Sequence, residues 1–229
     1  MIRTLQVLAA SAALAFTTLA AQTYPPPFPR PNATKILSTD QVVVWRVVWP
    51  KGEPTALHRH PHDQVGTYYA PGGRVITGLD GKKREVTTAV GDLSNTKKGT
   101  THIEEGSTDS PLRAVFLELL HDGPSGRLDT SSSVAPAFPR EGAEKRSDDE
   151  RVTVWDYTWP TGTSTGEMRY PRNTVTVWLG TGSIRVTSSD GDSTTVAAAP
   201  GEMRYSEAGT VEGMDVVSGA PRAIVFELK

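Results

Sequence analysis

The hydrophobic pattern along this chain consists of short apolar runs broken by glycine-rich and proline-rich turns. The clearest run covers residues 42–49, V-V-V-W-R-V-V-W, whose β-branched and aromatic residues favour a β-strand. Further short runs follow, separated by turn sequences such as Asp80-Gly81, until the run 114–120 closes the unit. Because the strands occur at this spacing without a long stretch of 3.6-residue periodicity, we predict an all-β sandwich or barrel.

The second half of the chain repeats the first half at an offset of 110 residues. Trp49-Pro50 recurs as Trp159-Pro160, and both halves end on similar runs, A-V-F-L-E-L from Ala114 and A-I-V-F-E-L from Ala223. Further agreements in the same register are Gly52 with Gly162, Gly91 with Gly201, Gly99 with Gly209, and Pro111 with Pro221. This repeat predicts the tandem duplication of one β-domain.

Five segments follow from these patterns. Residues 1–21 combine a short positive start, an apolar stretch and small residues, which is typical of a cleaved signal peptide, with an uncleaved anchor as the alternative. Residues 22–39 form a proline-rich N-terminal arm, which is either a tether or a segment packed on the domain. We expect the first β-domain at 40–121, a polar interdomain linker at 122–148, and the second β-domain at 149–229.

Composition narrows the compartment and the partners. The 24 Lys and Arg residues nearly balance 26 Asp and Glu residues, so charge gives no reason to expect nucleic acid or an anionic membrane as a partner. The chain has no cysteine, which excludes thiolate metal sites, cysteine nucleophiles and disulfides. Together with the leader, this predicts a periplasmic or secreted protein with a small-molecule substrate, no membrane contact beyond the signal peptide, and a monomeric or homodimeric state.

Candidate metal ligands gather in the stretch 52–64. His58 and His60 are two residues apart, so on a β-strand both imidazoles face the same side. Gln64 follows four residues later, and His102 lies downstream. Imidazole is the commonest protein ligand for metals, and three convergent imidazoles can hold a divalent transition metal. We therefore predict one such ion, namely Zn, Mn, Ni, Fe or Cu, bound by His58, His60 and His102; Gln64 either ligates it or hydrogen-bonds a ligand or water.

These residues resemble the two motifs of the cupin family. The first motif, G-x5-H-x-H-x3,4-E-x6-G, is similar to the stretch that starts at Gly52 and runs through His58-Arg-His60 to Gln64. The second, G-x5-P-x-G-x2-H-x3-N, is similar to the stretch from Gly91 to His102. The chain departs from the pattern at Gln64 for Glu, Lys97 for Pro and Gly106 for Asn. The resemblance implies two tandem double-stranded β-helix, or jelly-roll, barrels, which together make a bicupin.

A narrower resemblance concerns the stretch His58-Arg-His60-Pro-His62-Asp-Gln64. It is similar to the H-x-H-P-H-x-Q pattern of small cupins, which include pectin-degradation enzymes that open unsaturated uronate rings and use a Gln as a ligand. A second similarity, from Asp80-Gly-Lys-Lys-Arg-Glu-Val and the terminal Phe-Glu-Leu-Lys229, is to single-domain cupins of mostly unassigned function. Neither similarity identifies a substrate.

The metal ligands do not recur in the second half. At the same offset His58, His60, Gln64 and His102 become Met168, Tyr170, Thr174 and Glu212. A thioether and one carboxylate do not make a site for a hard or borderline metal ion. We therefore expect the second domain to keep the fold without the site and to serve as a cover or an interface.

Four other residues near the motifs belong either to the site or to the surrounding structure. Glu104, two residues after His102, is either a general base facing the same cavity or a solvated glutamate beside Glu105. Tyr68 either lines the pocket or packs in the core with a wet hydroxyl. His62 is expected either behind the metal ligands or at the rim of the site. Glu118 recurs as Glu227, which suggests a structural role in both domains.

The neutral donor set indicates the reaction class. Three imidazoles and an amide leave the charge of a divalent ion uncompensated, which favours a Lewis acid over oxygen activation. We predict a metal-dependent enzyme of isomerase or lyase type that acts on a small oxygenated substrate, with a sugar acid as a candidate. The alternatives are a quercetinase-like dioxygenase and a non-catalytic periplasmic module that binds a small molecule or a metal.

Overall fold

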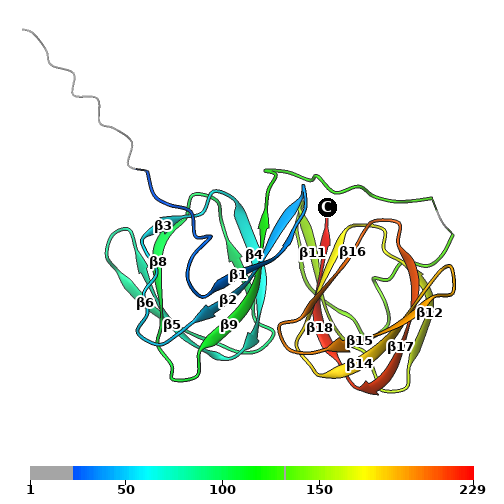
Figure 1. Cartoon of the computed structure of the whole chain (residues 1–229). Coiled ribbons are helices and arrows are strands. Elements are labelled where there is room, and N and C mark those ends of the chain that lie inside the picture. Colours follow the sequence, from blue (N-terminus) through cyan, green and yellow to red (C-terminus); the bar gives the residue numbers. More distant parts are fainter. Residues whose placement is uncertain (1–22, 132) are drawn as a thin grey trace, which may run out of the picture.

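The computed structural model describes residues 23–131 and 133–229, which form two β-barrels in sequence (Figure 1). These residues contain 18 strands in four sheets and no helix, which confirms the all-β prediction. It follows that no helix capable of spanning a membrane occurs in the described part of the chain. The expected signal peptide, residues 1–21, lies outside the described residues.

The first barrel consists of nine strands in two facing sheets. The five-stranded sheet has the order β1-β2-β9-β4-β7 and the four-stranded sheet the order β3-β8-β5-β6, with antiparallel pairing throughout. The strands are β1 (Ala33–Ser38), β2 (Val42–Trp49), β3 (His58–Arg59), β4 (Asp63–Ala70), β5 (Gly72–Gly78), β6 (Lys83–Thr88), β7 (Leu93–Thr96), β8 (Thr101–Gly106) and β9 (Leu112–Leu119).

The second barrel has the same topology. Its sheets have the orders β10-β11-β18-β13-β16 and β12-β17-β14-β15, which correspond strand by strand to those of the first barrel. The strands are β10 (Glu144–Asp148), β11 (Val152–Thr158), β12 (Ser164–Arg169), β13 (Thr174–Trp178), β14 (Gly182–Ser188), β15 (Ser193–Ala198), β16 (Met203–Ser206), β17 (Val211–Gly219) and β18 (Arg222–Leu228).

Both barrels begin earlier in the chain than the sequence suggested. β1 lies inside the segment expected to be an arm, and β10 lies inside the segment expected to be a linker, and each pairs with the strand that follows it. Upstream of β1, Phe28 stacks on Trp45 with ring centroids 4.7 Å apart, and upstream of β10, Phe138 stacks on Trp155 at 5.9 Å. The arm is therefore part of the first barrel, and the end of the linker is part of the second.

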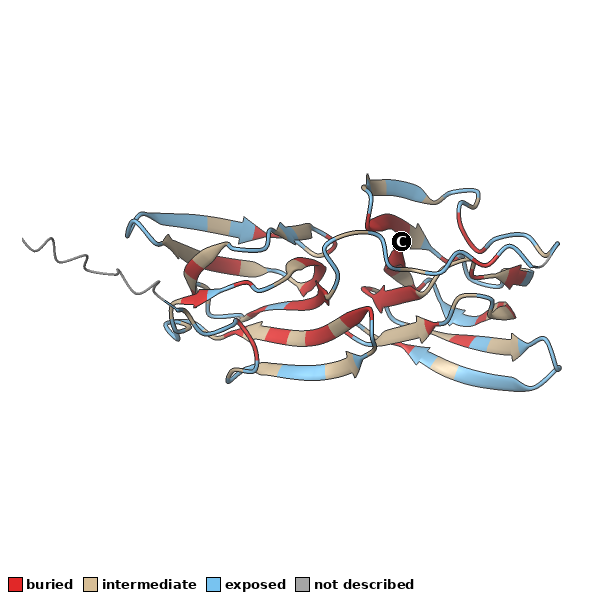
Figure 2. Ribbon diagram, turned by 90° about the horizontal axis from the view of Figure 1, so that it is seen from above, coloured by how far each residue is buried: buried red, intermediate tan, exposed pale blue. Residues whose placement is uncertain are grey.

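The two barrels share a hydrophobic core where their five-stranded sheets face each other. β2 is buried on both faces: Val42 and Val44 pack toward the second barrel, whereas Trp45, Val47 and Trp49 fill the interior of the first. Burial on both faces explains the nearly continuous apolar run at 42–49. Residues on β9, β11, β13 and β18 complete the shared core, including Val115, Leu117, Val152, Val154, Val175, Ile224 and Phe226. Figure 2 shows buried residues along the strands of both barrels.

Ion pairs border this shared core and link the barrels directly. Arg151 donates from Nη1 to Oδ2 of Asp63 at 2.9 Å, and Nη2 of Arg46 lies 3.0 Å from Oε1 of Glu202. The Arg151 guanidinium is largely buried and also donates to the carbonyl of Leu119, so it contributes to the packing of the interface as well as to its charge balance.

Candidate metal centre

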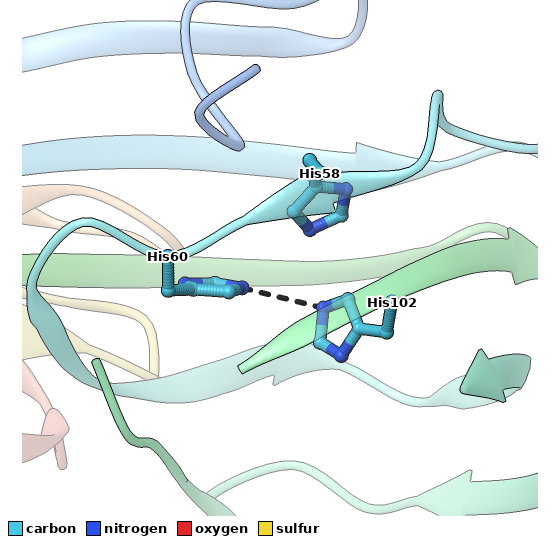
Figure 3. Close-up of side chains that lie close together, drawn as sticks. All are labelled: His58, His60 and His102. Atoms are coloured by element: carbon cyan, nitrogen blue, oxygen red, sulfur yellow. Dashed lines mark hydrogen bonds between the residues drawn. The ribbon is translucent and has the colours of Figure 1, made fainter. Parts of the chain in front are cut away.

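Three histidines converge inside the first barrel. His58 on β3 pairs in register with His102 on the neighbouring strand β8, and His60 follows just after β3 ends. Their ligand atoms all lie within 4.8 Å of one another, and all three residues are buried. Figure 3 shows the three rings turned toward a common point. The site is thus assembled from two strands that are adjacent in the sheet and distant in the sequence.

The turn before β8 fixes the position of His60. The amide of His60 donates to the carbonyl of Thr100 at 2.9 Å, and the amide of Gly99 donates to the carbonyl of His60 at 2.8 Å. Gly99 has a φ of 86°, a conformation that favours glycine over residues with a side chain. This glycine of the second motif therefore anchors the segment that carries a histidine of the first motif.

The imidazole of His58 is held as the ring of a metal-ligating histidine usually is. Nδ1 of His58 lies 2.9 Å from the carbonyl oxygen of Ala56, which only a protonated Nδ1 can satisfy, so Nε2 presents its lone pair. Nε2 of His58 is buried without a hydrogen-bond partner, as is Nδ1 of His60. Nε2 of His60 and Nε2 of His102 face each other at 3.3 Å. Orphaned buried nitrogen atoms of this kind fit a divalent transition ion, for which neutral imidazole is a good ligand.

The electrostatic surroundings keep the histidines neutral. Burial lowers the pKa of His58 and of His102 below the ordinary value. Burial, together with the neighbouring His102 and His58, lowers the pKa of His60 to about 3. Because metal ligation requires deprotonated imidazole nitrogen, these shifts make the three rings available as ligands at neutral pH.

Gln64, the fourth predicted ligand, lies on β4. It pairs in register with Thr96 on β7 and Glu118 on β9, and only 2% of its surface is exposed. Its side-chain Nε2 is buried without a hydrogen-bond partner. A buried amide without a hydrogen-bond partner is consistent with a site that binds a further group. Ligation of the metal by Gln64 stays a prediction.

Glu104 is neither solvated nor free to act as a base. It lines the same cavity as His102 but is 7% exposed, and its carboxylate accepts from Nη1 of Arg74 at 2.5 Å and from Nε1 of Trp49 at 3.0 Å. Burial alone would raise its pKa, but Arg74, with His102 and Arg30, holds the pKa of Glu104 below its ordinary value. A carboxylate that is paired in this way is a weak proton acceptor, so the geometry argues against the predicted general-base role.

Tyr68 joins the same polar cluster. Arg74 donates from Nη2 to the Tyr68 hydroxyl at 2.6 Å, and Tyr68 is 2% exposed. Burial raises the pKa of Tyr68, while Arg74 works in the opposite direction. Tyr68 therefore lines the cavity and also packs in the core beside Trp49 and Phe116, so each of its two interpretations describes part of its place. Its raised pKa keeps the hydroxyl protonated at neutral pH.

Arg74 is a central residue of this cluster that the sequence did not reveal. It lies on β5, its side chain is 10% exposed, and it connects Glu104 to Tyr68. In the sequence, Arg74 precedes valine, isoleucine and threonine and resembles an arginine on the solvent-facing side of a strand. The available signal was that the second half carries Ile184 at the equivalent position, which is fully buried.

A cavity of about 560 Å³, here called the barrel cavity, opens beside His102. Its lining includes Tyr68, Arg74 and Glu104 together with Arg84, Asn95 and Lys97. Several hydroxyl groups from Thr87, Thr88, Ser94, Thr96 and Thr100 also line it. Asp92 lines the cavity too, so Arg84 and Lys97 are its cations besides the paired Arg74 and Glu104. A polar wall with these two cations is suited to a small oxygenated anion.

The two remaining predicted residues, Glu118 and His62, lie outside the histidine cluster. Glu118 accepts a hydrogen bond from Nε1 of Trp45, and Glu227 accepts the equivalent bond from Nε1 of Trp155. The two glutamates thus make the same structural contact in both barrels. His62 is half-buried and does not belong to the cluster of convergent histidines.

The second barrel fills the equivalent position with other side chains. Arg204 donates through both Nη atoms to the two carboxylate oxygens of Glu212, which stands where His102 stands in the first barrel. Met168 and Tyr170, in place of His58 and His60, are buried in the interior cluster of this barrel. Met214 replaces Glu104, and Nε1 of Trp159 is buried without the partner that its equivalent Trp49 has.

Two barrels of this strand order, one of them with buried convergent histidines, define a tandem double-stranded β-helix protein with a candidate metal centre. Comparison with solved structures gives the fold its name. Solved structures that include a cupin 2 conserved barrel protein match 82–90% of this chain, and we conclude that its two barrels have the cupin fold.

Three solved structures illustrate the likeness. AerE from Microcystis aeruginosa has 13% identity and a TM-score of 0.63 and covers 90% of this chain and 98% of its own. A cupin 2 conserved barrel protein from Leptotrichia buccalis has 13% identity and a TM-score of 0.55, covering 86% and 88%. Salicylate 1,2-dioxygenase from Pseudoaminobacter salicylatoxidans, with gentisate, has 15% identity and a TM-score of 0.56, covering 82% and 68%.

No family model matches the sequence. No curated protein matches it either. The identities to the solved structures are low, so the likeness concerns the fold alone, and the chemistry has to be argued from the residues of the site.

Proposed function

We propose that the first barrel binds one divalent transition metal ion through His58, His60 and His102, with Gln64 as a further ligand, and that the protein is a metal-dependent enzyme. The observation that carries this proposal is the buried histidine triad, with its orphaned nitrogen atoms, at the wall of a polar cavity. A neutral donor set leaves the charge of the ion uncompensated, so the ion would serve as a Lewis acid toward a bound oxygen atom.

The barrel cavity supports a small oxygenated acid as the substrate. Arg84 and Lys97 offer positive charge for a carboxylate, and the threonine and serine hydroxyls offer partners for substrate hydroxyl groups. Few of the lining residues are large and apolar, which suits a sugar acid better than an aromatic ring. Isomerase or lyase chemistry on such a substrate needs proton transfer and no oxidant.

The residues of the cavity have distinct roles in this proposal. Tyr68 keeps its proton and faces the cavity, so it is the candidate proton donor. Glu104 fixes the Arg74 guanidinium, which in turn orients the Tyr68 hydroxyl. Glu104 and Arg74 are therefore positioning residues rather than proton carriers.

A dioxygenase is the second candidate. The salicylate 1,2-dioxygenase with bound gentisate shares the fold over 82% of this chain, and its name links such a barrel to oxygen chemistry on a carboxylate. The neutral donors and the hydroxyl-rich cavity of this chain favour the Lewis-acid reaction over that alternative.

Metal analysis of the purified protein tests the site first. We expect about one equivalent of a transition metal per chain, and expect His58→Ala to lose it. Met168→Ala, the equivalent change in the second barrel, is the matched control and should keep the metal. Retention of the metal by the His58 variant would overturn the assignment.

Turnover assays then separate the candidate functions. Loss of ultraviolet absorbance from unsaturated uronates, without oxygen uptake, supports the Lewis-acid reaction. Oxygen uptake on flavonols or catechols would support the dioxygenase instead. Tight binding of an oxygenated acid without turnover would replace both by a binding module.

The proposal also covers the evolutionary origin, the cellular location and the oligomeric state of the protein. The in-register repeat of the sequence and the matching strand orders support an origin by tandem duplication. Residues 1–21 support export to the periplasm or the exterior. The shared core between the two barrels supports a monomer, because it already covers the sheet that a second copy would cover.

A further inference from the structure

A second cavity, of about 630 Å³, lies between the N-terminal arm and the loop before β3. We call it the arm cavity. Prolines supply much of its wall, from Pro25, Pro26, Pro27 and Pro29 on the arm to Pro50 and Pro54 on the loop. Because proline fixes its own backbone angle, this part of the wall is preformed and apolar. Asn32, Glu53 and Thr55 add polar groups elsewhere in the lining, and the Glu53 carboxylate accepts a hydrogen bond from Asn32.

The arm cavity and the barrel cavity approach the metal centre through different residues. Arg30 lines the arm cavity, and its Nη2 lies 3.8 Å from Oε2 of Glu104, which lines the barrel cavity. His58 lines the arm cavity, and its ring centroid lies 4.7 Å from that of His102, which lines the barrel cavity. A ligand held at the three histidines is therefore within reach of both cavities.

Arg30 gives the arm cavity a specific chemistry. Its side chain is 15% exposed, and its guanidinium lies over the rings of Phe28 and Trp49, at 5.7 and 5.5 Å from their centroids. Its Nε is buried and has no hydrogen-bond partner. A guanidinium that is withdrawn from water, with an N–H to spare, is a strong site for a carboxylate.

The second barrel provides an internal reference for this arginine. Arg140 follows Phe138-Pro139 as Arg30 follows Phe28-Pro29, and it donates from Nη2 to Sδ of Met168 at 3.4 Å. Met168 stands in the place of His58. The fold itself therefore brings an arginine to this position in both barrels, but only in the first does its charge act on histidines.

We propose that the arm cavity binds the apolar part of an organic anion whose carboxylate is held by Arg30 beside the metal centre. The inference rests on the proposed function, and it adds that the substrate has two parts. The oxygenated part lies in the barrel cavity, an apolar substituent lies in the arm cavity, and the anionic group lies at the junction between them.

The charge requirement is tested by calorimetry on the full, metal-loaded chain. The probes are 1-naphthoate and its neutral analogue 1-naphthamide. We expect naphthoate to bind at least about tenfold more tightly, because a hydrogen bond to a charged group stabilises a complex more than a neutral one. Arg30→Gln should abolish this preference, whereas Arg140→Gln, the matched change in the second barrel, should preserve it. Equal binding of both probes to the unaltered protein would overturn the inference.

The location of the binding site is tested by filling the arm cavity. Ala56 lines it at an exposed position, so Ala56→Trp should place an indole in the cavity and weaken naphthoate binding at least about tenfold, while Ala56→Ser should not. Unchanged naphthoate binding by Ala56→Trp would place the probe elsewhere and overturn the inference.

Metal content, measured in the same samples, separates this inference from the proposed function. A chain that holds metal and turns over its substrate but does not distinguish the two probes would overturn the arm-cavity assignment alone. A chain that distinguishes the probes but holds no metal would overturn the proposed function and leave the cavity as an anion site.

Discussion

The two barrels share a topology and differ in what fills their interiors. Packing contacts recur, as in Trp45 with Glu118 and Trp155 with Glu227. The polar cluster does not recur, since Ile184 and Met214 replace Arg74 and Glu104 in the second barrel. Features present in both barrels therefore belong to the fold, and features confined to the first belong to its chemistry. By this criterion Arg74 and Glu104 are parts of the site as much as the histidines are.

The difference also has a visible cost in the second barrel. Trp49 donates its indole N–H to Glu104, whereas the indole N–H of Trp159 is buried without a partner. A lost hydrogen bond of this kind costs about 1–3 kcal/mol. Replacement of a buried ion pair by apolar side chains can offset that cost, because it removes the desolvation penalty of two charges.

Replacing Arg74 and Glu104 by the residues that the second barrel carries tests this comparison and should have the largest effect on stability. Arg74→Ile should lower the free energy of unfolding by about 3–5 kcal/mol, because Glu104 loses its closest cation while buried. The double variant R74I/E104M should recover most of this loss. Urea denaturation of both variants measures the difference, and equal destabilisation by the single and double variants would contradict the pairing.

Sequence patterns predicted the framework of this site but not its polar cluster. The spacing of His58 and His60 and the resemblance to the two cupin motifs together predicted three convergent ligands. Spacing alone does not bring His102 to the other two, because that depends on the pairing of β3 with β8. Arg74 escaped notice because its role depends on β5 lying beside β8 in the sheet. The expectation of a solvated Glu104 failed for the same reason, since pairing in a sheet decides which side chains are covered.

The limits of the barrels were also hard to read from sequence. β1 and β10 are short and mostly exposed or half-buried, so they lack the alternation that identifies a strand. They are held by pairing with the strands that follow, β2 and β11, and the preceding Phe28 and Phe138 pack in the barrel interiors. A comparison of Phe28-Pro29-Arg30 with Phe138-Pro139-Arg140 extends the repeat upstream and was the available signal.

The shared core offers a second way to test the comparison, with an effect of intermediate size. Leu117 is fully buried between the barrels, so Leu117→Ala should cost about 2–5 kcal/mol. Because residues of both barrels form this core, we expect one cooperative transition at lower denaturant concentration, monitored by tryptophan fluorescence and circular dichroism. Separate transitions for the two barrels would show that each is stable alone.

A pH dependence common to both barrels is the smallest expected effect. Burial raises the pKa of Glu118 and of Glu227, and the bond from the neighbouring tryptophan only partly opposes the shift. The folded chain therefore holds these protons more tightly than the unfolded chain, and stability falls as the pH rises from about 4.5 through the raised pKa values.

Glu118→Gln should remove the contribution of one barrel to this fall and Glu227→Gln that of the other. We expect each variant to change the stability at pH 7 by less than about 1 kcal/mol, since a glutamine oxygen can still accept the indole bond. Unfolding curves at pH 4.5 and pH 7 measure the change. A decrease in stability with rising pH that is identical in both variants and the parent would contradict the assignment.

The strand β2, buried on both of its faces, joins the two barrels thermodynamically. One face belongs to the core shared with the second barrel and the other to the interior of the first barrel, which also holds the histidine triad. Any ion or small molecule that binds only the folded first barrel therefore raises the melting temperature of the second barrel as well. The melting temperature of the second barrel, which lacks the histidines, thus depends on whether the first barrel is occupied. A shift in the melting temperature of the whole chain is therefore a direct assay for molecules that bind either cavity.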